Sequence, residues 1–330
     1  MRIEEVWAGR GAGHALLRIL LAPLSGLYWL GWQAYLAVYR IGLKRAKEPH
    51  CPVICIGNLT VGGSGKTPVT IHVAKLLREL GQEVVISASG YGSKAAEGAN
   101  LARTAVTNQP APSLPAQEWG DEPAMIRWLL PDVPLIVGRD RVRAAEICHQ
   151  HFPDAILLLD DGLQHLPLKK HLQICLDDPS ATNRMVLPAG PYREPRTSLG
   201  RMDRVIDDLR FQPTGFLLNG AEPAEQPTSA NALCAIARPE RFFDTLSGQG
   251  IEIAAAKSLP DHDPLTAGTL FEGLPSGLPL IVTAKDWVKL RDRSDIESRQ
   301  ILVAMQEARI EPEDEFKAWL RSKLDEISKA

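Results

Sequence analysis

Short apolar runs alternate with helical spacings along the middle of the chain. Buried strands are predicted at 53–56, 83–87, 135–137, 155–159 and 172–176, with helices between them at 68–80, 122–130 and 139–151. This alternation is typical of a parallel sheet with helices on both faces. Residues 94–119 are small and polar with several prolines, which predicts a loop with at most short elements.

A second pattern follows in the last third of the chain. We interpret the polar, proline-containing stretch 212–231 as a domain transition. Beyond it, strands or helices are predicted at 232–236, 241–250, 280–283 and 313–329. At 330 residues, length favours two domains. We therefore expect an N-terminal segment (1–46), a core (47–210) and a smaller C-terminal α/β domain (211–330), whose last helix is a candidate to pack back on the core.

The N-terminal segment is hydrophobic and flanked by cations. Residues 19–39 carry no charge, and residues 1–50 contain seven Arg or Lys against three Glu. The stretch is long enough to span a bilayer, although Pro23, Ser25 and Gly26 interrupt it. Its aromatic residues and basic flanks suit the headgroup zone of an anionic leaflet. We predict a membrane-associated helix, spanning or lying on the bilayer; the alternative is a buried amphipathic helix of a soluble fold.

The run Thr60-Val61-Gly62-Gly63-Ser64-Gly65-Lys66-Thr67 joins the first predicted strand to the first predicted helix. Strand, glycine-rich turn, lysine, hydroxyl and helix are the parts of a phosphate-binding loop. Glycines let backbone N–H groups converge on phosphate oxygens at the helix N-terminus. We expect Lys66 to reach the β- and γ-phosphates and Thr67 to offer its hydroxyl to Mg²⁺. This makes the sheet a P-loop NTPase type; the alternative is a turn without a nucleotide, since Thr60 replaces the usual first glycine.

Two acidic residues, Asp160 and Asp161, end the apolar run 156–159. Carboxylates at the end of a buried strand hold Mg²⁺ in P-loop proteins, directly or through water. Adjacent side chains leave a strand in different directions, so we expect separate tasks for them. The alternative is a common strand-end turn.

Other segments carry groups for acid–base chemistry and phosphate binding. Asp121 precedes a predicted helix, where a carboxylate is either an N-cap or the base that accepts an alcohol's proton. Arg193 and Arg196 lie in a stiff, proline-rich loop and offer guanidinium groups to phosphates. His262 stands between Asp261 and Asp263, which would raise its pKa. For each, local salt bridges in a surface loop are the alternative.

Composition and missing motifs narrow the class of protein. A net charge of −3 provides no whole-protein attraction to nucleic acid. The five cysteines lack C-x-x-C spacing, which favours reduced cytoplasmic thiols over disulfides or zinc. Val61 rather than Lys precedes Gly62, and no L-S-G-G-Q-like segment occurs, which disfavours partitioning and transporter ATPases. Lys285 and Asp286 are adjacent, so they lack the spacing of a guanine-reading N-K-x-D.

Together, these segments resemble the tetraacyldisaccharide 4'-kinase family, the lipid A 4'-kinases of Gram-negative bacteria. The matching pieces are, in order, Gly57-Asn58 to Thr67-Pro68, Gly90-Tyr91-Gly92, Gly120-Asp121-Glu122-Pro123, Asp160-Asp161-Gly162-Leu163-Gln164-His165, Leu187-Pro188-Ala189-Gly190-Pro191, Arg193-Glu194-Pro195, Pro239-Glu240-Arg241-Phe242-Phe243, Asp261-His262 and Lys285-Asp286. The family's hydrophobic N-terminal helix matches residues 15–43.

The resemblance implies transfer of the ATP γ-phosphate to the 4'-hydroxyl of a tetraacyldisaccharide 1-phosphate, which makes lipid IVA at the cytoplasmic face of the bacterial inner membrane. It implies ATP and Mg²⁺ as cofactors, a lipid disaccharide and an anionic membrane surface as partners, and neither nucleic acid nor an obligate protein partner. The implied catalytic residues are Lys66, Asp121 and His262, the metal residues Thr67, Asp160 and Asp161, and the substrate-side residues Asn58, Gln164, His165, Arg193 and Glu194. Residues 60–67 would bind the nucleotide.

Some positions depart from the family pattern. Ser89 replaces an arginine before Gly90, so a phosphate or carboxylate contact is either missing or supplied by Lys94. A homologue that binds nucleotide without turnover is therefore one alternative. A P-loop ATPase or GTPase switch, docked to a partner through its N-terminal helix, is another.

The N-terminal helix leads to a first prediction. Deleting residues 1–43 should release the protein from membranes, because the apolar stretch and most of its basic flank are lost. Flotation with lipid vesicles measures this. Continued flotation of the truncated protein would assign the anchoring to another surface.

Overall fold

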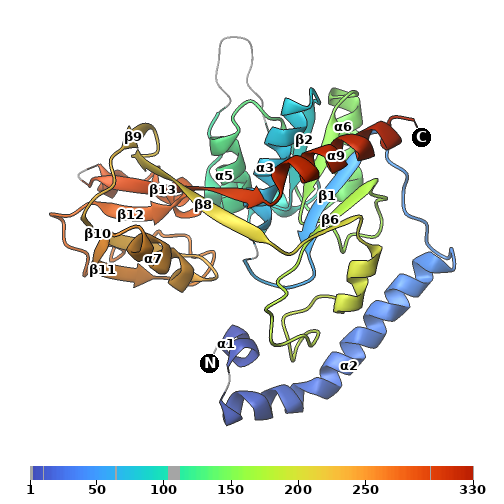
Figure 1. Ribbon diagram of the computed structural model, residues 1–330, viewed down its shortest axis with the longest axis horizontal. Coiled ribbons are helices and arrows are strands. Elements are labelled where there is room, and N and C mark those ends of the chain that lie inside the picture. Colours follow the sequence, from blue (N-terminus) through green and yellow to red (C-terminus); the bar gives the residue numbers. More distant parts are fainter. Residues whose placement is uncertain (1–2, 10, 64, 103–111, 298, 330) are drawn as a thin grey trace.

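The computed structural model describes residues 3–9, 11–63, 65–102, 112–297 and 299–329. Ser64 of the phosphate-binding loop lies outside these residues. Two β-sheets with associated helices lie side by side, and a long N-terminal helix runs past the first of them (Figure 1).

The first sheet is parallel except at one edge. Its strands are, in spatial order, β3 (Asn100–Ala102), β4 (Leu135–Val137), β2 (Val84–Ala88), β5 (Ile156–Asp160), β1 (Val53–Asn58), β6 (Leu172–Leu176) and β7 (Arg204–Ile206). Only β3, which pairs with β4, is antiparallel. All residues of β1, β2 and β5 are buried, as expected for strands covered on both faces.

Helices cover both faces of this sheet, as the sequence predicted. They are α3 (Lys66–Glu79), α4 (Ala116–Trp119), α5 (Asp121–Leu129) and α6 (Arg141–His151), with the 3₁₀ turns η1 (Lys94–Ala96) and η2 (Arg196–Arg201). Alternate strand residues point to opposite faces. Thus Leu158 of β5 packs in the same cluster as Val73 of α3, whereas Leu157 packs in the same cluster as Cys148 of α6.

The second sheet is mixed. Its strands are, in spatial order, β11 (Glu252–Ser258), β10 (Ser229–Cys234), β12 (Leu280–Thr283), β13 (Ile301–Ile310), β8 (Leu209–Leu218) and β9 (Glu222–Ala224). The first four are mutually parallel, and β8 runs antiparallel to β13 and β9. Its helical elements are α7 (Pro239–Gly248), α8 (Ala284–Leu290) and the 3₁₀ turn η3 (Ser294–Ile296).

The interpretation of 212–231 as a domain transition was wrong. Most of this stretch belongs to β8, β9 and β10 of the second sheet. The strand β8 escaped prediction because much of it is exposed, and because Pro213 interrupts its pattern. Pro213 pairs with Gln306 where the register to β13 shifts, an irregularity at which a residue without an N–H is tolerated.

The two sheets are connected twice, by residues 207–208 before β8 and by 311–312 after β13. The paired strands β8 and β13 run from the second sheet toward the first (Figure 1). The last helix, α9 (Glu313–Ile327), then lies beside the first sheet, where Lys317 Nζ is 2.5 Å from Glu79 Oε2 of α3. The chain thus ends against the unit in which its phosphate-binding loop lies.

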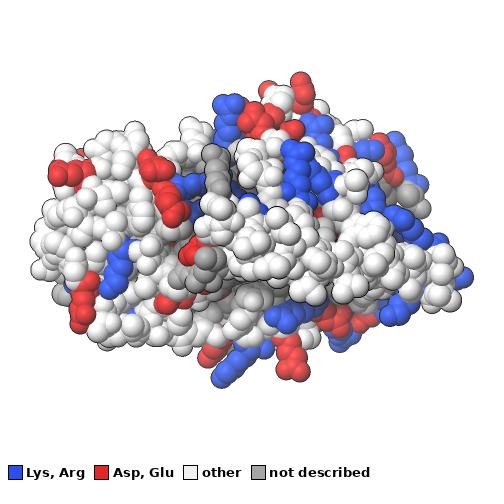
Figure 2. Space-filling view, turned by 90° about the horizontal axis from the view of Figure 1, so that it is seen from below, with Lys and Arg blue, Asp and Glu red and all other residues white. Residues whose placement is uncertain are grey.

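The N-terminal helices are α1 (Ile3–Ala8) and α2 (Ala12–Arg40). In the described residues α2 alone is long and apolar enough, by length and composition, to cross a membrane, and little of it is buried. Figure 2 shows this side of the molecule, where an uncharged band is bordered by Lys and Arg. This helix is therefore a candidate membrane anchor.

A prediction on stability follows from α9. Phe316 is fully buried in the large core cluster, so Phe316→Ala should lower the free energy of unfolding by about 3–5 kcal/mol. Arg321→Ala, on the exposed side of the same helix, should change it by less than about 0.5 kcal/mol. Urea unfolding compares the two. Equal effects would show that α9 does not dock on the core.

Candidate active site

The phosphate-binding loop connects β1 to α3 at the carboxyl edge of the first sheet. Gly62 and Gly65 have φ of 104° and 79°, which disfavour residues with a Cβ. A Cβ at Gly65 would also collide with the ring of Phe211 from β8. The helix begins at Lys66, earlier than predicted. Thr60, the irregular position, forms a β-bridge to Tyr192, and its Oγ1 accepts a hydrogen bond from Asn58 Nδ2 (2.9 Å).

Asp160 lies next to the start of α3. The hydroxyls of Thr67 and Thr70 donate to its two carboxylate oxygens at 2.8 and 2.9 Å. Burial raises the pKa of Asp160 to about 6. The hydroxyl and the carboxylate that the sequence assigns to a metal ion therefore lie side by side, at the end of β5.

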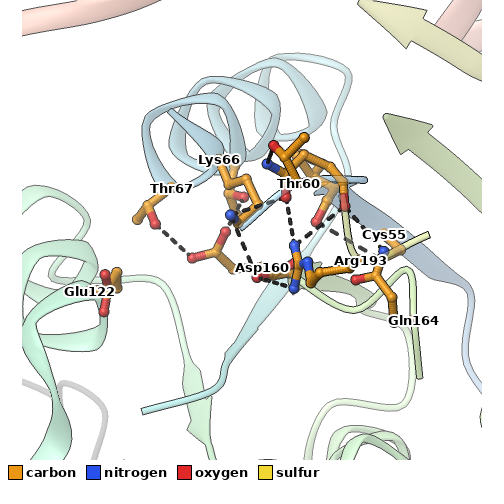
Figure 3. Close-up of polar contacts among 12 residues, drawn as sticks. Cys55, Thr60, Lys66, Thr67, Glu122, Asp160, Gln164 and Arg193 are labelled. Atoms are coloured by element: carbon orange, nitrogen blue, oxygen red, sulfur yellow. Dashed lines mark hydrogen bonds and ion pairs between the residues drawn. The ribbon is translucent and has the colours of Figure 1, made fainter. Parts of the chain in front are cut away.

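Asp161 points to a different set of groups, as expected for adjacent residues. Arg193 Nη2 and Nη1 donate to its two oxygens at 2.9 and 3.2 Å, a bidentate pair, and Lys66 Nζ lies 3.5 Å away. Burial opposes the ionised form, but Lys66 and Arg193 outweigh it and lower the pKa of Asp161. Asn58 Oδ1 accepts from both Arg193 (2.6 Å) and Lys66 (3.2 Å). Figure 3 shows Lys66 and Thr67 at the start of α3, with Asp160 and Arg193 converging on them from other parts of the chain.

Sequence reasoning missed Arg141, the first residue of α6. Its buried guanidinium donates to the carbonyl of Asp160 (2.8 Å) and to the hydroxyl of Ser87 (2.8 Å). These bonds tie the carboxyl ends of β5 and β2 together. No sequence signal set this arginine apart, because it lies inside the predicted helix 139–151, where an arginine is an ordinary residue.

The remaining substrate-side residues differ in position. Gln164 Nε2 donates to Glu194 (2.7 Å) and to the Asn58 carbonyl (3.1 Å). Glu194 is fully buried and also pairs with Arg201. In this structure its carboxylate therefore binds side chains of the protein itself. The side chain of His165 is not brought into this set. Burial lowers its pKa to about 4.

The second half of the site is a carboxylate–imidazole pair. Asp121 is the first residue of α5, and its Oδ2 lies 3.2 Å from His262 Nδ1. The N-cap of α5 is Gly120, so the N-cap interpretation of Asp121 is wrong. The hydrogen bond to Asp121 raises the pKa of His262. Burial opposes ionisation of Asp121, but His262 and Lys289 lower its pKa. His262 has φ of 63°, a strained backbone of the kind found at functional sites.

Two lysines of α8 complete this cluster, and sequence reasoning gave them no role. Lys285 Nζ lies 3.0 Å from Asp261 Oδ1, 3.2 Å from Glu122 Oε1 and 3.5 Å from His262 Nε2. Lys289 is almost fully buried, 3.7 Å from Asp121 Oδ2. The spacing of four residues, which places both lysines on one helix face, was the available signal.

A cavity of about 700 Å³ follows Tyr91 in the chain and is lined by Gly92, Ser93, Lys94, Ala96, Glu97, Gly98, Arg139 and Asp140. The ring of Tyr91 lies 5.5 Å from that of His262, and the Arg139 guanidinium lies 5.7 Å from the Tyr91 ring centre. Both Lys94 and Arg139 thus bring positive charge to the region of Ser89.

The two halves meet because both sheets direct their carboxyl ends to the same place. Helices that follow parallel strands begin at that edge, which positions Lys66 and Asp121. His262 follows β11 and pairs with Asp121, and Ala237 follows β10 beside Gly63. A site of this composition, with a phosphate loop, paired carboxylates and a facing acid–base pair, defines a P-loop phosphotransferase.

Comparisons with known proteins specify the family. The family model described as tetraacyldisaccharide-1-P 4'-kinase matches residues 17–325. Curated tetraacyldisaccharide 4'-kinases of Shewanella loihica and Shewanella halifaxensis are each 36% identical, over 308 and 307 residues, covering 88% of either chain. The chain belongs to the tetraacyldisaccharide 4'-kinase family. Membership in a kinase family decides against the switch or assembly factor.

A solved structure is similar over nearly the whole chain. It is the crystal structure of the "apo" form of LpxK from Aquifex aeolicus in complex with ATP. It covers 93% of this chain and 99% of its own, with a TM-score of 0.78 and 25% sequence identity. The predicted P-loop α/β fold is confirmed.

The carboxylate–imidazole pair leads to a prediction on pH. The pKa of His262 should lie above 6.5 in the folded protein and fall in Asp121→Asn, because the hydrogen bond that raises it is then lost while burial and Lys285 still lower it. Its contribution to stability should be complete below the unfolded pKa and be lost as pH rises through the raised folded pKa. NMR titration of the His262 ring measures both proteins. An unchanged pKa in Asp121→Asn would contradict the pairing.

Proposed function

We propose that this protein transfers the γ-phosphate of ATP to the 4'-hydroxyl of a tetraacyldisaccharide 1-phosphate, at the cytoplasmic face of the bacterial inner membrane. Family membership supports the reaction class. The observation that carries the division of labour is that Lys66 and the Asp121–His262 pair stand at the facing carboxyl ends of two sheets. A donor phosphate and an acceptor hydroxyl can meet between them.

On the donor side, Lys66 and Arg193 supply positive charge to the transferred phosphoryl group. Both now contact Asp161, so a bound triphosphate competes with that carboxylate for the same cations. Phosphoryl transfer depends mainly on positioning and on stabilising charge spread over the phosphate oxygens. The backbone N–H groups of the loop and the N-terminus of α3 act in the same direction.

The residues around Asp160 fit a magnesium ion. In the described residues no cluster of three or more His, Cys, Asp or Glu could hold a metal by itself. Nucleotide-bound magnesium needs only one or two protein ligands beside phosphates and waters. Thr67 and Asp160, 2.8 Å apart, provide an oxygen ligand and a carboxylate to orient bound water, and Asp161 stands beside them. When bound, the ion neutralises phosphate charge.

On the acceptor side, we assign proton acceptance to the Asp121–His262 pair. The pKa of Asp121 is lowered, so this carboxylate is ionised at neutral pH. The hydrogen bond to Asp121 raises the pKa of His262, so the imidazole holds a proton more readily than a free histidine does. Lys285, close to His262 Nε2, opposes a second positive charge there and so favours release of the proton from the ring.

The remaining residues would serve the lipid disaccharide and the membrane. Arg193 and Asn58 are the substrate-side groups closest to the phosphate loop, while Gln164 is oriented by the buried Glu194. The uncharged band over α2 (Figure 2) would lie against the membrane that also holds the acyl chains of the substrate. The helix ends at Arg40, and Lys44 and Arg45 follow it; these cations suit an anionic leaflet.

The direct test is product analysis from radiolabelled ATP and the lipid acceptor. Lys66→Ala, Asp121→Ala and Asp161→Ala should each lower kcat by at least about 100-fold, the usual scale for such groups. Lys75→Ala, on the exposed side of α3, is the matched control and should retain turnover. ATP hydrolysis without a phosphorylated lipid product would refute the proposal.

A further inference from the structure

The helix α2 exposes its most apolar side. Its outward side is apolar, and Ile19, Leu20 and Leu27 are 64–67% exposed. Its inward side is mixed: it includes the buried Leu36, but also the buried Ser25 and, one turn after Ser25, the half-buried Tyr28. An apolar outer face suits lipid. The hydroxyls that point inward must then be explained by what they bind.

Both hydroxyls bind the loop that carries Arg193. The Ser25 hydroxyl donates to the Val186 carbonyl and accepts from the Ala189 N–H, each at 2.9 Å. The Tyr28 hydroxyl donates to the carbonyl of Arg193 itself at 2.7 Å. These are bonds between the candidate membrane helix and the backbone of a segment more than 150 residues away in sequence.

The backbone of Arg193 is held from both sides. Its N–H donates to the Leu59 carbonyl at 2.7 Å, at the start of the phosphate-binding loop, while its carbonyl accepts from Tyr28. Nearby, the Val61 N–H donates to the Pro191 carbonyl at 2.8 Å. The Arg193 side chain then reaches Asp161 and Asn58. A continuous set of hydrogen bonds thus runs from α2 to the phosphate site.

We propose that Ser25 and Tyr28 are positioning residues, through which the membrane-docked helix α2 sets the place of Arg193 at the phosphate site. The expected effect on turnover rests on the proposed kinase function. Helix α2 is held mainly by one face, so lipid on its other face restricts its motion relative to the loop. The Arg193 side chain is directed by hydrogen bonds to Asp161 and Asn58, and displacement of a group at a reacting centre by about 1 Å can cost 100-fold in rate.

Tyr28→Phe tests the proposal with minimal change, since it removes one hydroxyl and keeps the ring. Turnover should fall about 10-fold, the scale of one lost hydrogen bond to a buried carbonyl, with little change in the KM for ATP. Tyr39→Phe is the matched control: its hydroxyl neighbours Tyr35 on the same helix, not the loop, and its turnover should match wild type. Both variants should float with vesicles of phosphatidylethanolamine and phosphatidylglycerol as the wild type does.

A double-mutant cycle separates positioning from general stability. If Tyr28 acts through Arg193, then adding Tyr28→Phe to Arg193→Lys should lower turnover by less than about 2-fold, because the group being positioned is already changed. An undiminished 10-fold loss in the Arg193→Lys background would overturn the proposal. Equal turnover of Tyr28→Phe and Tyr39→Phe would overturn it as well.

Hydrogen exchange provides a readout that does not need kinase activity. The amides of Leu187, Gly190 and Tyr192 are hydrogen bonded within the loop and should exchange faster in Tyr28→Phe than in wild type or Tyr39→Phe. If the wild type phosphorylates no lipid, the kinase proposal fails, and this comparison still decides whether Tyr28 holds the loop. Identical exchange in all three proteins would show that it does not.

Discussion

Two adjacent carboxylates, Asp160 and Asp161, stand at the end of a buried strand. The arrangement of the side chains around them follows from the need to compensate both charges. An uncompensated buried charge is strongly unfavourable. Asp160 receives two hydroxyl donors from α3, while Asp161 receives Arg193 and lies beside Lys66. The same bonds fix the start of α3 and the loop that carries Arg193. The carboxylates therefore organise the candidate phosphate site.

A second constraint is the direction of the strands. Parallel strands direct their carboxyl ends to one edge, and each sheet of this protein contributes such an edge to the site. The first sheet supplies the phosphate loop and Asp121, and the second supplies His262 with the lysines of α8. The candidate acid–base pair thus takes one residue from each sheet, and the paired strands β8 and β13 join those sheets.

Local patterns predicted most of the first sheet and its helices. Strands such as β5, buried on both faces, read as apolar runs, and the glycine-rich turn explains the start of α3. The strand β8 was missed because it is exposed and interrupted at Pro213, so neither an apolar run nor clean alternation marks it. Its strand character comes from pairing with β13, about ninety residues later, which a local pattern does not contain.

For the site, the sequence by itself determined the chemistry: a phosphate loop with Lys66 and Thr67, carboxylates at Asp160 and Asp161, and a candidate base at Asp121. These types and spacings are local, and they follow from what phosphates and metal ions require. Only the tertiary structure decided the partners. It paired Asp121 with His262 and bound Tyr28 to Arg193. Such contacts join residues more than a hundred positions apart, and they exist only where packing of the sheets and α2 brings them together.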